Sequence, residues 1–148
     1  MSLDRECITE VVSVNDGKEI LRQKALLDQI GEMCDLWRNQ EGGPNPVLAE
    51  FDWKTEYVFS IGQNRPRFDG FKDRVGLEHE TREQMNVRSH LLWIEAGYQS
   101  DEIEAGVFVI PSGNYGSVSR TARELNDEIF TEYFPIKCPL LLVEYDPD

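Results

Sequence analysis

The chain has 148 residues, enough for one domain with its own core, and we expect residues 1–148 to form a single domain. No apolar run approaches the roughly 20 residues of a membrane span, and the first ten residues lack the basic and apolar regions of a signal peptide. The sequence therefore excludes a membrane span and predicts a cytoplasmic protein.

The net charge of −13 argues against a nucleic-acid partner, because phosphate contacts require a cationic surface. The charge is unevenly distributed, however. Residues 54–88 hold 7 Lys/Arg against 6 Asp/Glu, whereas residues 1–53 hold 5 against 11 and residues 89–148 hold 3 against 11. Nearly half of the cations therefore lie in the segment that carries the candidate site described below.

The first predicted element is a helix over residues 17–38. Asp16 is expected to be its N-cap, with Glu19 as the capping-box partner. Apolar residues then recur at helical spacing, namely Ile20, Leu27, Ile30, Cys34 and Trp37. The glycines and prolines of residues 41–46 predict a loop after this helix.

Three strands are predicted next. Apolar residues alternate over residues 51–61, which is the period of a half-buried strand. Residues 67–71 and 75–80 then flank Lys72-Asp73-Arg74, the pattern of a hairpin.

The second half of the chain alternates helix and strand. The sequence predicts a helix over residues 83–98, an apolar strand over 105–110, a second helix through residues 122–133 and a last strand over 140–143. The polar loop from Ser112 to Gly116 is either a DNA contact or a simple connection. A hairpin followed by crossover helices predicts an α/β fold with a mixed β-sheet flanked by helices.

The three cysteines, Cys7, Cys34 and Cys138, are far apart and include no CxxC pair. We expect reduced thiols rather than zinc ligands. Cys34 lies on an apolar helical stripe and Cys138 lies in the apolar terminal strand, so both are expected in the core.

The segment from Arg65 to Glu80 concentrates carboxylates. Glu78 and Glu80 are two residues apart on one strand, so the pleat points both to one face and His79 to the other. The hairpin brings Asp69 beside them. Three clustered anions raise one another's pKa unless a cation compensates, and oxygen ligands suit Mg²⁺ or Mn²⁺. The alternative is an ordinary edge strand with a solvated Glu-His-Glu face.

This segment resembles the PD-(D/E)XK nuclease superfamily. Pro66-Arg67-Phe68-Asp69 matches its Pro-Asp element loosely, and Glu78-His79-Glu80 stands where acid-x-Lys is expected. Glu80 replaces the lysine, as in the Glu-x-Glu restriction enzymes resembling BamHI, whereas relatives of BglII use Glu-x-Gln. The resemblance covers about residues 17–110 and implies an αβββαβ restriction-endonuclease-like core, with a further αβ unit after it in this chain.

The resemblance implies hydrolysis of DNA phosphodiesters with Mg²⁺ or Mn²⁺. Asp69, Glu78 and the backbone carbonyl of His79 would bind the metal, and Glu80 would orient or deprotonate the attacking water. The positive charge of the missing lysine would come from a second metal ion or from an arginine. The candidate arginines are Arg74, Arg82 and Arg88, and the same three are the candidate DNA contacts. Because one site cuts one strand, we expect a homodimer.

Further residues are weaker candidates. Glu32, on the first helix, is an accessory acid or a solvated side chain. Three acids border the first predicted strand, namely Glu50, Asp52 and Glu56. Either one of them approaches the carboxylate cluster or none does. His79 and His90 titrate in the range of a general base. However, His79 points away from the carboxylates and His90 lies on a helix.

Two other functions remain open. The first is a catalytically inactive protein that binds a protein or nucleic acid. The second is a metal-binding regulatory module without hydrolysis. The sequence has no nucleophile elbow for Ser-His-Asp catalysis and no phosphate-binding glycine-rich motif.

Overall fold

The structure, a computed structural model, describes residues 3–40, 42–80, 87–113 and 117–148. These residues form a six-stranded sheet in the order β1-β6-β5-β4-β3-β2. The strands β4, β5 and β6 are parallel, and the other neighbours pair antiparallel. The predicted mixed sheet is therefore confirmed. The strand bounds are β1 (Ile8–Val14), β2 (Lys54–Val58), β3 (Arg67–Lys72), β4 (Val75–His79), β5 (Ala105–Pro111) and β6 (Leu140–Tyr145).

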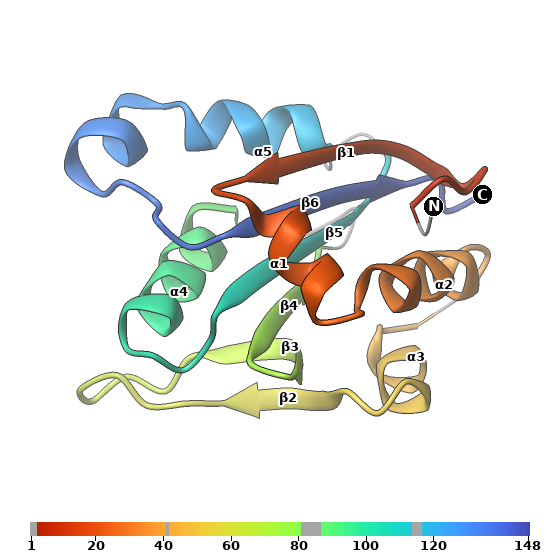
Figure 1. The fold of residues 1–148 in the computed structure, drawn as a ribbon, viewed down its shortest axis with the longest axis horizontal. Coiled ribbons are helices and arrows are strands. Elements are labelled where there is room, and N and C mark those ends of the chain that lie inside the picture. The colour runs from red at the N-terminus through yellow and green to blue at the C-terminus, as the bar shows by residue number, and fades with distance from the viewer. Residues whose placement is uncertain (1–2, 41, 81–86, 114–116) are drawn as a thin grey trace.

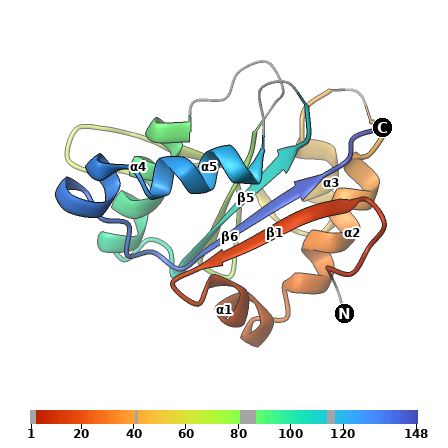
Figure 2. The same ribbon diagram turned by 90° about the horizontal axis from the view of Figure 1, so that it is seen from above.

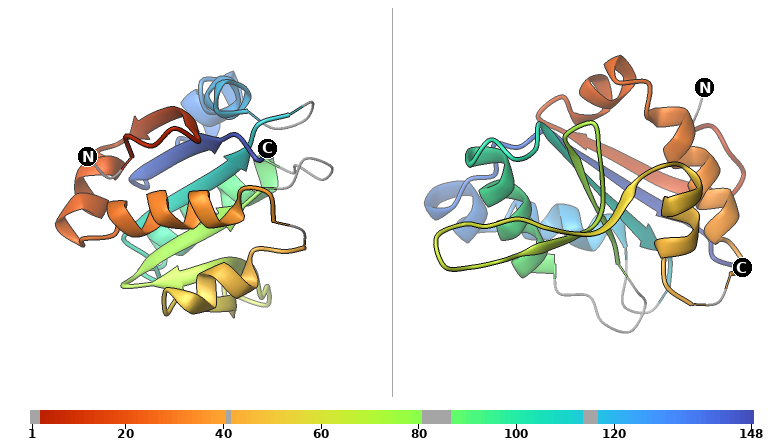
Figure 3. Two further views of the ribbon diagram at one scale, coloured as in Figure 1. Left: turned by 90° about the vertical axis from the view of Figure 1, so that its right-hand side faces the viewer. Right: turned by 90° about the horizontal axis from the view of Figure 1, so that it is seen from below.

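Helices cover both faces of the sheet (Figures 1 and 2). One face carries α1 (Gly17–Gln23), α2 (Leu27–Trp37) and α3 (Asn45–Glu50), and the other carries α4 (Val87–Gln99), α5 (Val118–Leu125) and a short π-helix (Ile129–Tyr133). The views of Figure 3 show the sheet between these two layers. Among the described residues, no helix combines the length and apolar character needed to cross a membrane.

Each face of the sheet has its own core. In β5, Val107 and Val109 pack towards α1–α3, whereas Phe108 and Ile110 pack towards α4 and α5. All residues of β5 are buried, as predicted for a strand covered on both faces. Both α4 and α5 lie on the same face because each connects parallel neighbours in the order β4, β5, β6. Cys34 and Cys138 are fully buried, one in each core, as predicted.

The N-terminal half departs from the prediction in several places. The strand β1 was not predicted; it pairs with β6, more than 120 residues away. The helix over 17–38 is two helices, because Ala25 has a positive φ of 58° and turns the chain. The capping box is wrong as well, since Asp16 has a φ of 64° and its side chain accepts no capping hydrogen bond.

The remaining differences concern where elements begin and end. The segment predicted as a loop contains the start of α3, where Pro46 occupies the first turn, a position at which proline is tolerated. The following strand begins at Lys54 rather than at residue 51. The helix predicted through residues 122–133 ends at Leu125 and is followed by the π-helix.

The β3–β4 hairpin has a two-residue turn. Asp73 and Arg74 have φ values of 49° and 62°, the left-handed conformation that a tight antiparallel turn needs. The register places Lys72 opposite Val75 and Gly70 opposite Leu77. This hairpin brings Asp69 of β3 next to the end of β4.

Candidate metal centre

Glu78 and Glu80 lie at the carboxyl end of β4, on the face covered by α4. Both side chains are buried, with exposed fractions of 4% and 2%. The backbone N–H of Glu80 donates to the carbonyl of Val109 at 2.9 Å, so the pairing with β5 continues past His79. The pleat thus keeps both glutamates on one face, as their spacing predicted.

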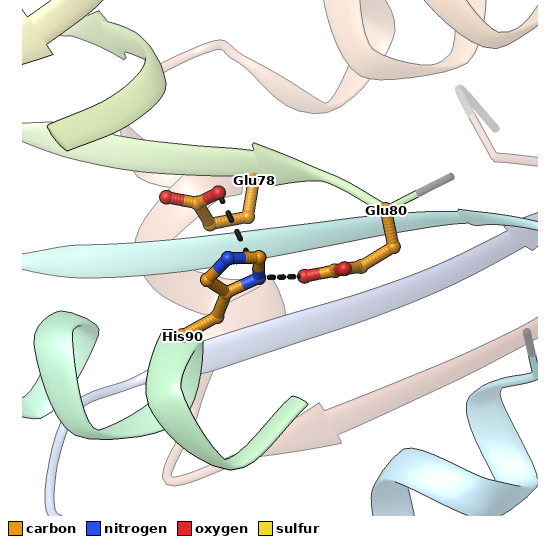
Figure 4. A group of neighbouring side chains, drawn as sticks. All are labelled: Glu78, Glu80 and His90. Atoms are coloured by element: carbon orange, nitrogen blue, oxygen red, sulfur yellow. Dashed lines mark hydrogen bonds and ion pairs between the residues drawn. The ribbon is translucent and has the colours of Figure 1, made fainter. Parts of the chain in front are cut away.

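His90, in the first turns of α4, completes the cluster (Figure 4). Its Nδ1 is hydrogen-bonded to Oε1 of Glu80 and lies 4.0 Å from Oε2 of Glu78. The three side chains each offer a ligand atom, and these atoms lie within 4.8 Å of one another. A carboxylate pair and an imidazole therefore converge between β4 and α4.

Asp69 joins the cluster from β3. Its Oδ2 accepts the backbone N–H of His79 at 2.8 Å, and its negative charge raises the pKa of the neighbouring Glu78 carboxyl group. The backbone pairing of β3 with β4 ends at Gly70, so the Asp69 side chain takes a place that a backbone carbonyl has elsewhere in the ladder. Glu78 is consequently a neighbour of Asp69 as well as of Glu80 and His90.

The crowding changes the titration of these groups. Burial, followed by the charges of Asp69 and Glu80, raises the pKa of Glu78 to about 10. Burial alone would lower the pKa of His90, but the hydrogen bond and charge of Glu80, together with the charge of Asp69, raise it above its usual value. In the metal-free protein the cluster therefore retains protons at neutral pH.

The donor set is suited to a divalent cation. Oε2 of Glu80 is buried and has no hydrogen-bond partner among the described residues. An unpaired buried carboxylate oxygen is unfavourable, and a bound cation is one way to satisfy it. The carboxylate oxygens of Asp69, Glu78 and Glu80 are ligands that Mg²⁺ and Mn²⁺ accept.

His79 points to the opposite face, as the pleat predicted. Its ring packs 4.7 Å from that of Trp37, and its Nε2 is hydrogen-bonded to the hydroxyl of Tyr145 at 2.9 Å. Burial lowers the pKa of His79 to about 4. The imidazole of His79 is therefore neutral and lies on the other side of the sheet from the carboxylates.

Arg74 lies at the far end of β4, in the hairpin turn. Its guanidinium forms ion pairs of 2.7 Å with Asp101 and Glu104. It precedes Glu78 by four positions along the chain, which corresponds to about 13 Å in a strand. This position gives Arg74 no contact with the cluster.

Arg88 and Arg82 were the other candidate cations. Arg88 pairs with Glu124 at 2.8 Å and with Asp127 at 3.2 Å, so it connects α4 to the end of α5. It is two positions before His90 on the helix, which turns it to a different side of α4. Arg82 lies outside the described residues.

The other candidate acids lie away from the cluster. Glu32 and Glu50 are exposed on α2 and α3, which cover the opposite face of the sheet. Asp52 is exposed in the turn after α3, and Glu56 of β2 pairs with Arg67 at 3.2 Å.

The loop after β5 is described only in part. The N–H of Ser112 donates to the carbonyl of Tyr145 at 2.8 Å and so extends the pairing of β5 with β6. Residues 114–116 lie outside the described residues, so a contact of this loop with DNA stays a prediction.

His90 was given little weight from the sequence, yet the structure places it within the cluster. A signal was present: His90 follows Val87 by three residues and precedes Ile94 by four, so it shares their side of the helix. Val87 and Ile94 are both buried against the sheet. The rotation of α4 relative to β4, which decides what His90 contacts, is not encoded in this spacing.

Comparison with known proteins identifies the fold. No family model and no curated protein sequence matches the chain. Among solved structures, restriction endonuclease BglII complexed with a DNA 16-mer matches with a TM-score of 0.73 and 15% sequence identity, over 94% of this chain and 76% of that chain. The chain therefore has a restriction-endonuclease-like fold.

Proposed function

We propose that this protein is a metal-dependent nuclease that hydrolyses DNA phosphodiesters with Mg²⁺ or Mn²⁺. The observation that carries the proposal is the convergence of Asp69, Glu78 and Glu80 at one end of the β3–β4 hairpin. The fold is shared with an endonuclease bound to DNA, which supports the same reading. A carboxylate cluster and a nuclease-like scaffold thus point to one chemistry.

Each acid has a distinct role in the proposal. Asp69 is oriented by the backbone N–H of His79, and with Glu78 and the His79 carbonyl it holds the ion. A divalent ion bound there would polarise a phosphate and lower the pKa of a bound water. Glu80, held by its hydrogen bond to His90, orients the attacking water or accepts its proton.

The proposed substrate is duplex DNA, and the proposed assembly is a homodimer. One cluster attacks one strand, so cleavage of both strands requires two clusters, which a symmetric dimer supplies. Arg74 and Arg88, the candidate DNA contacts among the described residues, are engaged in ion pairs within the chain.

Cleavage of DNA tests the proposal directly. We expect the protein to nick or linearise supercoiled DNA with Mg²⁺ or Mn²⁺. Asp69→Asn should reduce the rate by at least about 10²-fold, because loss of the metal should cost at least as much as loss of a positioned acid or base. Asp73→Asn is the matched control. It removes the same charge from the same hairpin, in an exposed turn where asparagine tolerates the positive φ.

The two rival functions predict different results. Wild-type protein that cuts no supercoiled, linear or branched DNA, yet melts at a higher temperature with Mn²⁺, would indicate a metal-binding module without hydrolysis. If neither cleavage nor a thermal shift occurs, a binding protein without a metal centre is favoured. The net charge of −13 is the feature that speaks for such a partner-binding role.

A further inference from the structure

The candidate metal centre contains an imidazole, and this separates it from an all-carboxylate site. We propose that Glu78, Glu80 and His90 bind a second divalent ion of the transition-metal type, such as Mn²⁺, beside the ion held by Asp69 and Glu78. This inference rests on the proposed function, because the two ions share Glu78.

The separations within the cluster suit a shared ion. Ligands of an octahedral ion at about 2.1 Å lie about 3.0 Å apart when adjacent and about 4.2 Å apart when opposite. The 4.0 Å between Nδ1 of His90 and Oε2 of Glu78 falls within this range. The hydrogen bond between His90 and Glu80 has to open slightly to admit the ion. His90, in the first turn of α4, is partly exposed, with a side-chain exposure of 32%, so its ring is not enclosed on every side.

A second observation, the unpaired carboxylate oxygen of Glu80, points to a cation bound next to Glu80. Glu80 is 98% buried, and its Oε2 has no hydrogen-bond partner among the described residues. Its other oxygen faces His90 (Figure 4). A cation between Glu78, Glu80 and His90 would satisfy the free oxygen.

Charge balance supports the same position. Three carboxylates converge, and one divalent ion compensates two of them. Of the described arginines on the hairpin and α4, Arg74 and Arg88 are paired with other acids. Arg67 of β3, whose charge acts on Glu78, is paired with the exposed Glu56. A second ion beside Glu80 supplies positive charge that Arg74 and Arg88 do not bring.

The imidazole also determines which ion is preferred. Mg²⁺ binds oxygen ligands and gives up its water reluctantly, whereas first-row transition metals accept imidazole nitrogen readily. The site on the Asp69 side has oxygen ligands only. We therefore expect Mg²⁺ to compete well at the Asp69 side and poorly at the His90 side.

Electron paramagnetic resonance of bound Mn²⁺ tests this inference without requiring activity. Pulsed measurements detect a nitrogen nucleus coordinated to Mn²⁺, and the chain contains only two histidines, His79 and His90. We expect two bound Mn²⁺ ions per chain and a nitrogen coupling. His90→Gln should abolish the coupling and weaken the second ion at least about tenfold, the smaller effect seen when a partner of a metal ligand is lost.

His79→Gln is the matched control, since its ring lies on the other face of the sheet and the coupling should persist. If that variant does not fold, as judged by circular dichroism, competition in the wild type replaces it. Excess Mg²⁺ should then displace the ion without nitrogen coupling and retain the coupled one.

The outcomes distinguish the two proposals. One bound Mn²⁺ without nitrogen coupling would overturn this inference and leave the proposed function intact. One bound Mn²⁺ with coupling that depends on His90 would overturn the second ion and assign His90 to a single shared site. No Mn²⁺ binding at all would refute both.

Discussion

The buried carboxyl group of Glu78 should make the metal-free protein less stable as the pH rises. Folding raises the pKa of Glu78 from about 4.5 to about 10, so the native state holds this proton more tightly than the unfolded chain does. The resulting stabilisation is fully present below pH 4.5 and is lost as the pH rises towards 10. Between these values the loss is about 1.4 kcal/mol for each pH unit.

The perturbation is Glu78→Gln, which keeps the size of the side chain and removes the titration. From pH 7 to pH 9, wild-type protein in EDTA should lose about 3 kcal/mol more unfolding free energy than the variant. His90 is present in both proteins, so most of its own pH dependence cancels in the comparison. The measurement is urea unfolding at several pH values, followed by fluorescence of the tryptophans.

Parallel pH profiles of wild type and Glu78→Gln would refute the reasoning. They would mean that Glu78 is already ionised in the metal-free native state, so that the carboxylates do not crowd one another. A second arm uses saturating Mn²⁺, which binds the ionised carboxylate. In that arm the wild type should keep its stability at pH 9, and the variant should gain less from the ion.

Two further predictions concern the packing around the site. Glu95→Gln should lower the free energy of unfolding by about 1.5–3 kcal/mol, because the buried Glu95 carboxylate accepts the N–H groups of Lys137 and Cys138 at 2.8 Å and the amide oxygen of glutamine would replace these charge-assisted bonds by weaker neutral ones. Urea unfolding beside the exposed control Glu128→Gln checks it, and equal midpoints would contradict it. Gly17→Ala should lower the melting temperature strongly, because an added Cβ would lie 2.0 Å from the backbone oxygen of Leu140; Gly43→Ala, where a Cβ meets nothing within 4 Å, should change it little. A Gly17→Ala protein as stable as wild type would show that α1 does not pack tightly on β6.

The sequence by itself determined the local features of the site. The two-residue spacing of Glu78 and Glu80 placed both on one face, since side chains alternate along a strand. The same alternation sent His79 to the other face, where it contacts Trp37 and Tyr145. The hairpin around Asp73 brought Asp69 beside Glu78, because a tight turn fixes the register of its strands.

Only the tertiary structure decided the features that depend on distant contacts. The strand β1 gains its hydrogen bonds from β6 at the other end of the chain, and a local pattern carries no record of that partner. The break at Ala25 has no glycine or proline to mark it, and it lies between Leu21 of α1 and Leu27 of α2, which are both buried in one core. His90 enters the cluster because α4 crosses β4 at a particular rotation, which depends on how buried side chains from both elements fit together.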